Sequence, residues 1–234
     1  MTPTVNVLAI DGPAGAGKST VSRRSAAALG LTVLDTGAMY RAVTLACLQA
    51  GIAPTDAEGC TAAAGRLTIN QRGDVTVTDG IDVSVAIRRP EVTAAVSAVS
   101  AHPGVRARMV RHQRRWADVS GGGVVEGRDI GTVVFPDARL KVFLVASPWE
   151  RAQRRRHDEQ AAGRDVDVAT LVREIEARDR LDATRSVSPM LAASDAVLVD
   201  TTGRTIDDVV AEIVARYRKS DPFPTGPGST GSHE

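Results

Sequence analysis

A phosphate-binding motif near the N-terminus constrains this chain more than any other feature. Residues 12–19 read GPAGAGKS, which satisfies the pattern G-x-x-x-x-G-K-[ST] in full. An apolar run at 5–10 precedes the motif and an apolar-periodic run at 21–29 follows it, so the motif lies between an expected strand and an expected helix. In that context the loop N–H groups and the helix N-terminus converge on phosphate oxygens. The sequence therefore predicts that the loop binds a nucleoside triphosphate.

Two side chains of the loop have expected chemical roles. Lys18, the only lysine in the first 140 residues, would reach the β and γ phosphates, and Ser19 would ligate Mg²⁺, the one cofactor expected with ATP. The predicted ATP-binding residues are Gly12, Pro13, Ala14, Gly15, Ala16, Gly17, Lys18, Ser19 and Thr20.

Composition limits the class of protein. The chain has 234 residues, of which 43% are hydrophobic and 24% charged, with a formal net charge of +1. These values are ordinary for a globular domain, exclude a disordered or collagen-like chain, and argue against a nucleic-acid partner. No apolar run approaches the ~18 residues of a membrane helix, and the N-terminus lacks a basic region followed by an apolar stretch. We expect a cytoplasmic protein without a membrane partner.

The order of the apolar runs indicates an α/β fold. Short β-rich runs at 5–10, 32–34, 124–125, 140–145 and 196–199 alternate with helical stretches, which favours a parallel sheet. Helix signals include SPWE at 147–150, a capping box, and an amphipathic stretch at 205–217. Residues 67–87 instead alternate with period two and contain two turn signals, so we expect a small antiparallel hairpin or three-stranded insert there. The Pro- and Gly-rich tail from Asp221 is expected to be disordered.

The motif leaves several functions open, and the rest of the chain narrows them. A GTPase switch needs N-K-x-D, but neither Asn6 nor Asn70 is followed by lysine. A motor or transporter ATPase would need a larger body and a strand ending in a paired acidic motif, which we do not find. A small kinase is therefore favoured.

The expected acceptor side follows the second strand. The segment LDTGAMYR at 34–41 lies at the carboxyl edge of the predicted sheet, so Asp35, Thr36, Tyr40 and Arg41 would face the same crevice as the phosphate loop. Planar guanidinium groups suit an acceptor phosphate and a transferring phosphoryl group. Further arginines at comparable positions are Arg106, Arg128 (beside Asp129), Arg178 and Arg185, and the run Arg151, Arg154, Arg155 and Arg156.

At LDTGAMYR and EGRDIGTVVFPDA the sequence resembles the bacterial cytidylate kinases, a nucleoside monophosphate kinase family, and their motifs occur in family order from about residue 5 to 218. The resemblance implies a P-loop NTPase three-layer fold with a parallel central sheet, a helical lid and a monophosphate-binding region enlarged by the β insert. It implies one domain over 1–220, with the core at 1–36, 100–150 and 186–220, the monophosphate-binding region at about 37–99 and the lid at about 151–185, followed by a disordered tail at 221–234.

The implied activity is transfer of the γ-phosphate of ATP to CMP or dCMP in pyrimidine nucleotide metabolism, by a monomer. The CMP-binding residues carried over by position are Thr36, Tyr40, Arg41, Ser97, Arg106, Arg128, Asp129, Arg178 and Arg185. The catalytic residues so implied are Lys18, Arg128, Arg154 and Arg178.

Individual roles also follow from the resemblance. Arg41 and Arg128 would hold the acceptor phosphate. Asp129 and Arg178 would read the sugar. Ser97 and Arg106 would read the cytosine edge. The family often has serine where this chain has Thr36, and glycine is also found where it has Ser19.

Two rival functions remain open at this point. One is a hydroxyl-acceptor kinase resembling shikimate kinase, with Asp35 as the base. It would leave the β insert and the many arginines unexplained. The other is a non-catalytic, nucleotide-dependent interaction protein.

Overall fold

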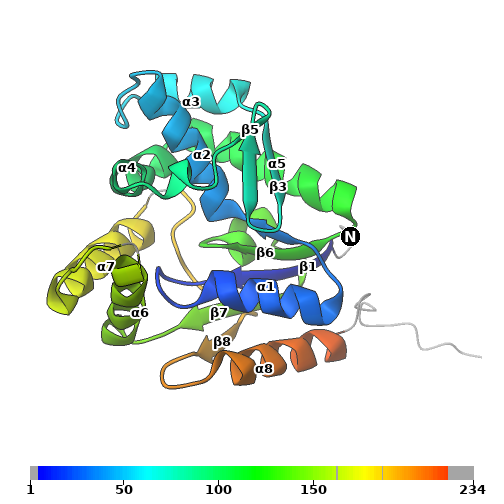
Figure 1. Cartoon of the computed structure of the whole chain (residues 1–234). Coiled ribbons are helices and arrows are strands. Elements are labelled where there is room, and N and C mark those ends of the chain that lie inside the picture. Colours follow the sequence, from blue (N-terminus) through cyan, green and yellow to red (C-terminus); the bar gives the residue numbers. More distant parts are fainter. Residues whose placement is uncertain (1–4, 162, 186, 221–234) are drawn as a thin grey trace, which may run out of the picture.

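A parallel five-stranded sheet forms the centre of the molecule, as predicted (Figure 1). The computed structural model describes residues 5–161, 163–185 and 187–220. The strands, in the spatial order β2-β6-β1-β7-β8, are β2 (Val33–Asp35), β6 (Gly123–Gly127), β1 (Val5–Asp11), β7 (Ala138–Val145) and β8 (Val197–Asp200). All paired strands are parallel, so their carboxyl ends meet at one edge.

Helices cover both faces of this sheet. On one face lie α1 (Lys18–Leu29) and α8 (Ile206–Lys219), and on the other lie α2 (Thr36–Gln49), α3 (Ala57–Arg66), α4 (Pro90–Ala101) and α5 (Pro103–Ser120). Alternate side chains of β1 point to opposite faces of the sheet. Leu8 and Ile10 pack toward α1 and α8, whereas Val7 and Ala9 pack toward α2 and its neighbours. A central strand buried on both faces needs a continuous apolar run, which residues 7–10 supply; Asn6, near the start of the strand, is exposed.

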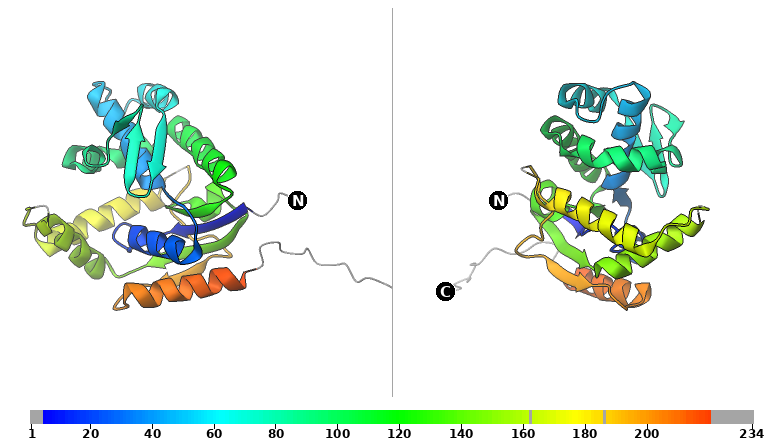
Figure 2. Two further views of the ribbon diagram at one scale, coloured as in Figure 1. Left: turned by 45° about the vertical axis from the view of Figure 1, so that its right-hand side comes forward. Right: turned by 90° about the vertical axis from the view of Figure 1, so that its left-hand side faces the viewer.

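A pair of helices, α6 (Pro148–Ala161) and α7 (Val168–Ala183), stands beside the sheet and has a small core of its own (Figure 2). Ala152, Leu171 and Ile175 form that core and are almost fully buried. Two short helical turns complete the chain, η1 (Ala86–Arg88) and the π-helical turn η2 (Ile130–Val134).

The insert is a separate antiparallel sheet of three strands. Its strands are β3 (Ile69–Arg72), β4 (Val75–Thr78) and β5 (Ile81–Asp82), paired in that order. The predicted three-stranded form is therefore confirmed. Both predicted turns occur, with left-handed backbone at Gly73 and at the pair Asp79 and Gly80.

The helix ends agree with the sequence signals with two differences. The Glu150 N–H donates to Ser147 Oγ at 3.2 Å, which is half of the predicted capping box. The other half is absent, because the Glu150 carboxylate pairs with Arg154 and the Ser147 N–H donates to Thr202. On α8 the predicted stripe is buried except for Ile206, which is 44% exposed.

The tail at 221–234, predicted to be disordered, lies outside the described residues. Within the residues that the structure describes, no helix combines the length and apolar character needed to cross a bilayer.

Two neighbouring glycines before β6 provide a test of the packing of the sheet. Gly122 has φ 103°, and a Cβ there would lie 2.0 Å from the Asn6 carbonyl oxygen. Gly121 also has a left-handed backbone but faces open space. We expect Gly122→Ala to lower the unfolding free energy by about 3 kcal/mol, because strain and overpacking add. Gly121→Ala should cost about 1 kcal/mol, the backbone contribution alone. Urea unfolding with unchanged m values measures both, and equal losses would contradict the proposed clash.

Candidate active site

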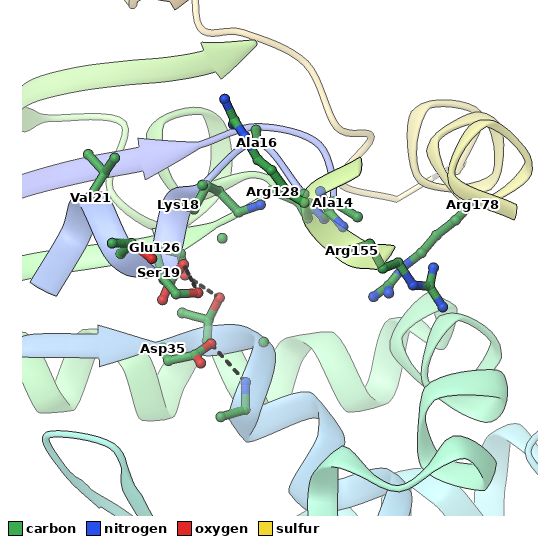
Figure 3. A pocket seen from close by; sticks show the side chains of 18 of the residues that line it. Ala14, Ala16, Lys18, Ser19, Val21, Asp35, Glu126, Arg128, Arg155 and Arg178 are labelled. Carbon is green, nitrogen blue, oxygen red and sulfur yellow. Dashed lines mark hydrogen bonds between the residues drawn. The ribbon is translucent and has the colours of Figure 1, made fainter. Parts of the chain in front are cut away.

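A large cavity of about 1050 Å³ opens where the central strands end (Figure 3). The register places Asp11 opposite Gly127 and Asp35 opposite Glu126, so three acidic side chains begin at one level of the sheet. The P-loop, the first turn of α2, the segment after β6, and parts of α6, α7 and α8 line the cavity. This is the position at which open parallel sheets bind their ligands.

The end of the phosphate loop leaves the first N–H groups of α1 available to a ligand. Gly17 precedes α1 with φ 89°, and no side chain caps this helix, so its first amides have no protein acceptor. Gly12 and Gly15 allow close approaches, because a Cβ at Gly12 would lie 2.3 Å from the Leu144 carbonyl oxygen. Residues 14–20 line the cavity, whereas Gly12 and Pro13 do not.

Lys18 folds back on the loop. Its Nζ donates to the Gly12 and Pro13 carbonyl oxygens, both at 2.8 Å. Burial, followed by the positive charge of Arg128, lowers the pKa of Lys18 to about 7, and the nearby Glu126 carboxylate opposes this change. A cation held against carbonyls and beside another cation is suited to receive an anion.

Glu126 is a site residue that the sequence analysis missed. It is the second-to-last residue of β6, is buried, and accepts a hydrogen bond from Ser19 Oγ at 3.0 Å. Burial and the charge of Asp35 raise its pKa. Its signal in the sequence is a single acidic residue after the apolar pair in VVEG, which is weaker than a paired acidic motif.

The oxygen atoms at this point fit Mg²⁺. The Ser19 hydroxyl lies on the Glu126 carboxylate, and Asp35 is close enough to affect its ionisation (Figure 3). Mg²⁺ prefers such hard oxygen ligands and is usually held by one or two protein groups together with phosphates and waters. Consistent with that mode, the described ranges contain no group of three or more His, Cys, Asp or Glu residues that would hold a metal unaided.

The start of α2 carries the predicted acceptor residues. Asp35 caps the helix by accepting from the Ala38 N–H at 2.9 Å, and Thr36 donates to the Glu126 carbonyl oxygen at 2.7 Å. Tyr40 is buried, and the Arg41 guanidinium donates to Thr93 Oγ1 at 2.8 Å. Thr36, Tyr40 and Arg41 all line the cavity that the P-loop also lines.

Two further predicted residues pair with each other. Arg106 of α5 and Asp129 form a buried ion pair, with side chains 4% and 6% exposed. The Arg106 guanidinium also lies 5.4 Å from the centre of the Tyr40 ring, a cation–π contact. These side chains therefore form one connected wall of the cavity.

Three arginines gather around Asp182, a second buried acid that the sequence analysis did not single out. Arg128 Nε lies 3.2 Å from Asp182 Oδ2, and Arg185 lies 3.5 Å from Oδ1. Arg128 also donates to the Gly12 carbonyl oxygen at 2.6 Å, so it contacts the P-loop. Burial and the charge of Arg128 lower the pKa of Arg178 to about 10. Around Asp182, positively charged side chains therefore outnumber negatively charged ones.

The arginine run on α6 divides into two groups. Arg154 and Arg155 line the cavity, and Arg154 donates to the Thr201 carbonyl oxygen at 2.9 Å. Arg151 is buried instead, donates to the Ala14 carbonyl oxygen at 3.0 Å and pairs with Asp179 of α7. Arg151 therefore links the helix pair to the P-loop.

One predicted residue lies apart from the others. Ser97 of α4 is half-buried and does not line the cavity, whereas Ser100, one turn further on, does. The Ser97 carbonyl accepts a hydrogen bond from Ser100 Oγ at 3.2 Å. The suggested contact of Ser97 with the base stays a prediction, as do the individual ligand roles of the other residues.

Comparison with known proteins identifies the family. The family model described as cytidylate kinase matches residues 8–219. A cytidylate kinase of Mycobacterium avium (strain 104) is 54% identical over 208 residues, covering 87% of this chain and 91% of the relative. A bifunctional pantoate ligase/cytidylate kinase of Synechococcus sp. (strain JA-2-3B'a(2-13)) is 50% identical over 224 residues, covering 93% of this chain but only 41% of that longer relative.

Among solved structures, an uncharacterized protein from Eubacterium ventriosum ATCC 27560 has a TM-score of 0.52 at 11% identity, covering 92% of this chain and 98% of that one. That likeness concerns the fold alone. The family model and the identity to single-function relatives settle the assignment, and the chain belongs to the cytidylate kinase family.

Proposed function

We propose that the protein transfers the γ-phosphoryl group of ATP to CMP or dCMP, giving CDP or dCDP. One observation carries the proposal: the P-loop with Lys18 and a second set of arginines, including Arg41 and Arg178, line the same cavity. Direct transfer between two phosphates requires two such anion sites facing each other. Family membership supplies the nucleotide class.

The chemistry asks mainly for positioning and charge neutralisation. The acceptor phosphate is already anionic, so no general base is needed. Lys18 would bind the transferring group, Arg41 and Arg128 the acceptor phosphate, and Arg154 and Arg178 the charge that develops between them. Mg²⁺, when bound with ATP, would neutralise phosphate charge, with Ser19 and Glu126 as its protein partners.

This assignment is favoured over a hydroxyl-acceptor kinase with Asp35 as base. The Asp35 carboxylate already accepts the Ala38 N–H as the cap of α2. That cap uses only Oδ1, so the preference rests on the family model and on the identity to cytidylate kinases.

The wider proposals rest on family membership. They are that the protein acts on ATP and CMP as a monomer in the cytoplasm. Residues 151–185 would be the lid, because they contribute Arg154, Arg155 and Arg178. Residues 37–99 would be the monophosphate-binding region.

A coupled assay of ADP formation tests the function. We expect turnover that requires both ATP and CMP and is not supported by shikimate. ADP formation that is independent of CMP, or none at all, would contradict the proposal.

Lys18→Met should reduce kcat by about a hundredfold or more, since it removes a charge aimed at the transferring phosphate. The matched control is Lys219→Met, at an exposed lysine near the end of α8. It should behave as wild type. A Lys18 variant within a few-fold of wild type, with unchanged melting temperature, would contradict the role of this lysine.

Two arginine variants should differ in base selectivity. Arg41→Met should lower kcat/KM for CMP and UMP alike, because every acceptor carries the phosphate. Arg106→Met should lower kcat/KM for CMP about tenfold more than for UMP, because a base-reading group is lost. Arg108→Met, at an exposed position on the same helix, is the control. Proportional losses in both variants would assign Arg106 to phosphate binding or structure.

Binding of ADP without Mg²⁺ should take up protons near neutral pH. The pKa of Lys18 in the free protein is lowered by burial and by Arg128, so part of the population is neutral, and a bound polyphosphate raises that pKa again. ADP affinity should therefore weaken as the pH rises through the lowered value. Calorimetry in two buffers with different ionisation heats measures the uptake. Lys18→Met should reduce it, and equal uptake in both proteins would rule out Lys18 as its source.

A further inference from the structure

The three-stranded insert meets the core sheet through one side chain. The Gln71 amide oxygen accepts from the Asp35 N–H at 3.0 Å, and the Gln71 amide nitrogen donates to the Asp35 carbonyl oxygen at 2.8 Å. Within the described residues no strand of the insert pairs with the five-stranded sheet. The side-chain amide of Gln71 therefore bonds to the main chain of Asp35 in the way that the backbone of a neighbouring strand would.

The residue that Gln71 holds is the point where β2 becomes α2. Strand β2 ends at Asp35 and helix α2 begins at Thr36, with no loop between them. β2 is also the edge of its sheet, paired only with β6. Without Gln71, the Asp35 N–H would lose its protein partner on the open side, and the Asp35 carbonyl would keep only the bond that an N-cap carbonyl accepts within its helix.

Asp35 in turn fixes the first turn of α2. Its carboxylate caps the helix through the Ala38 N–H, and the next residue, Thr36, is bonded to the Glu126 carbonyl oxygen. Tyr40 and Arg41 follow one turn later and line the cavity. A shift of Asp35 would thus move the acceptor side chains relative to the P-loop.

The insert has a second contact with the core that provides a matched control. Asp74, in the turn after β3, forms an ion pair with Arg23 of α1. These side chains are 68% and 42% exposed, so the pair should contribute little. Among the described residues Asp74 hydrogen-bonds to Arg23, and neither Asp35 nor any residue of α2 bonds to it. Asp74 itself does not line the cavity.

We propose that Gln71 is a positioning residue for the acceptor site: it holds Asp35 at the β2–α2 junction and so couples the insert to acceptor binding. This inference rests on the proposed function for its kinetic consequence. Its structural consequence, the order of the first turn of α2, does not depend on any activity.

The test compares Gln71→Met, which keeps an unbranched side chain of similar length but removes the amide, with Asp74→Asn. We expect Gln71→Met to lower kcat/KM for CMP about tenfold, the effect of losing one or two ordinary hydrogen bonds. KM for ATP should change clearly less than KM for CMP, since the hydrogen bonds of Gln71 go to Asp35 and not to the P-loop. Asp74→Asn should leave both within about twofold of wild type.

Hydrogen exchange supplies the readout without turnover. Gln71→Met should speed amide exchange at residues 35–41 and leave α1 unchanged, and Asp74→Asn should change neither region. A purely structural role would lower the melting temperature and the active fraction while leaving both KM values as they are. That result, or an equal rise in KM for CMP and ATP, or wild-type kinetics, would overturn the proposal. If the wild type itself lacks CMP-dependent turnover, the proposed function fails, and the exchange data alone decide the role of Gln71.

Discussion

The buried carboxylate of Asp11 ties the two halves of the candidate site together. Asp11 ends β1, directly before the P-loop, and accepts hydrogen bonds from the N–H groups of Ile130 and Gly131 at 2.9 and 2.8 Å. Those residues directly follow Arg128 and Asp129, so one side chain holds the acceptor-side segment against the strand that leads into the phosphate loop. Burial raises the pKa of Asp11 to about 6, although both backbone hydrogen bonds oppose the rise. Because the folded pKa lies above that of an exposed aspartate, ionisation of Asp11 at neutral pH opposes folding, and the geometry is obtained at a cost in stability.

The buried cations around the cavity also lower the stability of the folded protein. Burial lowers the pKa of Arg41 and Arg178, and the positive charges of neighbouring arginines add to the effect. Lys18 and Arg128 meanwhile donate to the carbonyl oxygen of Gly12. Such contacts satisfy donors without neutralising charge. A polyphosphate would replace carbonyl partners with anionic ones, so each cation gains more from the ligand than it loses from the loop. The same repulsion that destabilises the ligand-free site therefore favours binding.

The sequence predicted the structure well where a local pattern is compatible with only one conformation. It predicted less where the function of a residue depends on the direction of its side chain. The P-loop and the strand at 5–10 follow from composition and order, and the turn residues of the insert specify its hairpins. Orientation was harder: Arg151 and Arg154 are the same residue type three positions apart, yet one is buried against the P-loop and the other lines the cavity. Glu126 could not be predicted because one acidic residue near the end of a strand matches no sequence motif. The contact of Gln71 with Asp35 joins residues 36 positions apart and leaves no periodic trace.

The way in which the insert is attached has a consequence for the acceptor region. A strand added along the open edge of β2 would bond every second residue and fix the insert over its whole length. Here only Asp35 is bonded, so the insert is held to the sheet edge at a single residue, and the exposed Arg23–Asp74 pair adds little. That residue is also the cap of α2, and α2 carries Tyr40 and Arg41. If Gln71 acts as proposed, attachment at the cap rather than along the edge makes the β2–α2 junction one route by which a change in the insert reaches the acceptor side chains, beside the apolar core that Ile69 shares with α2.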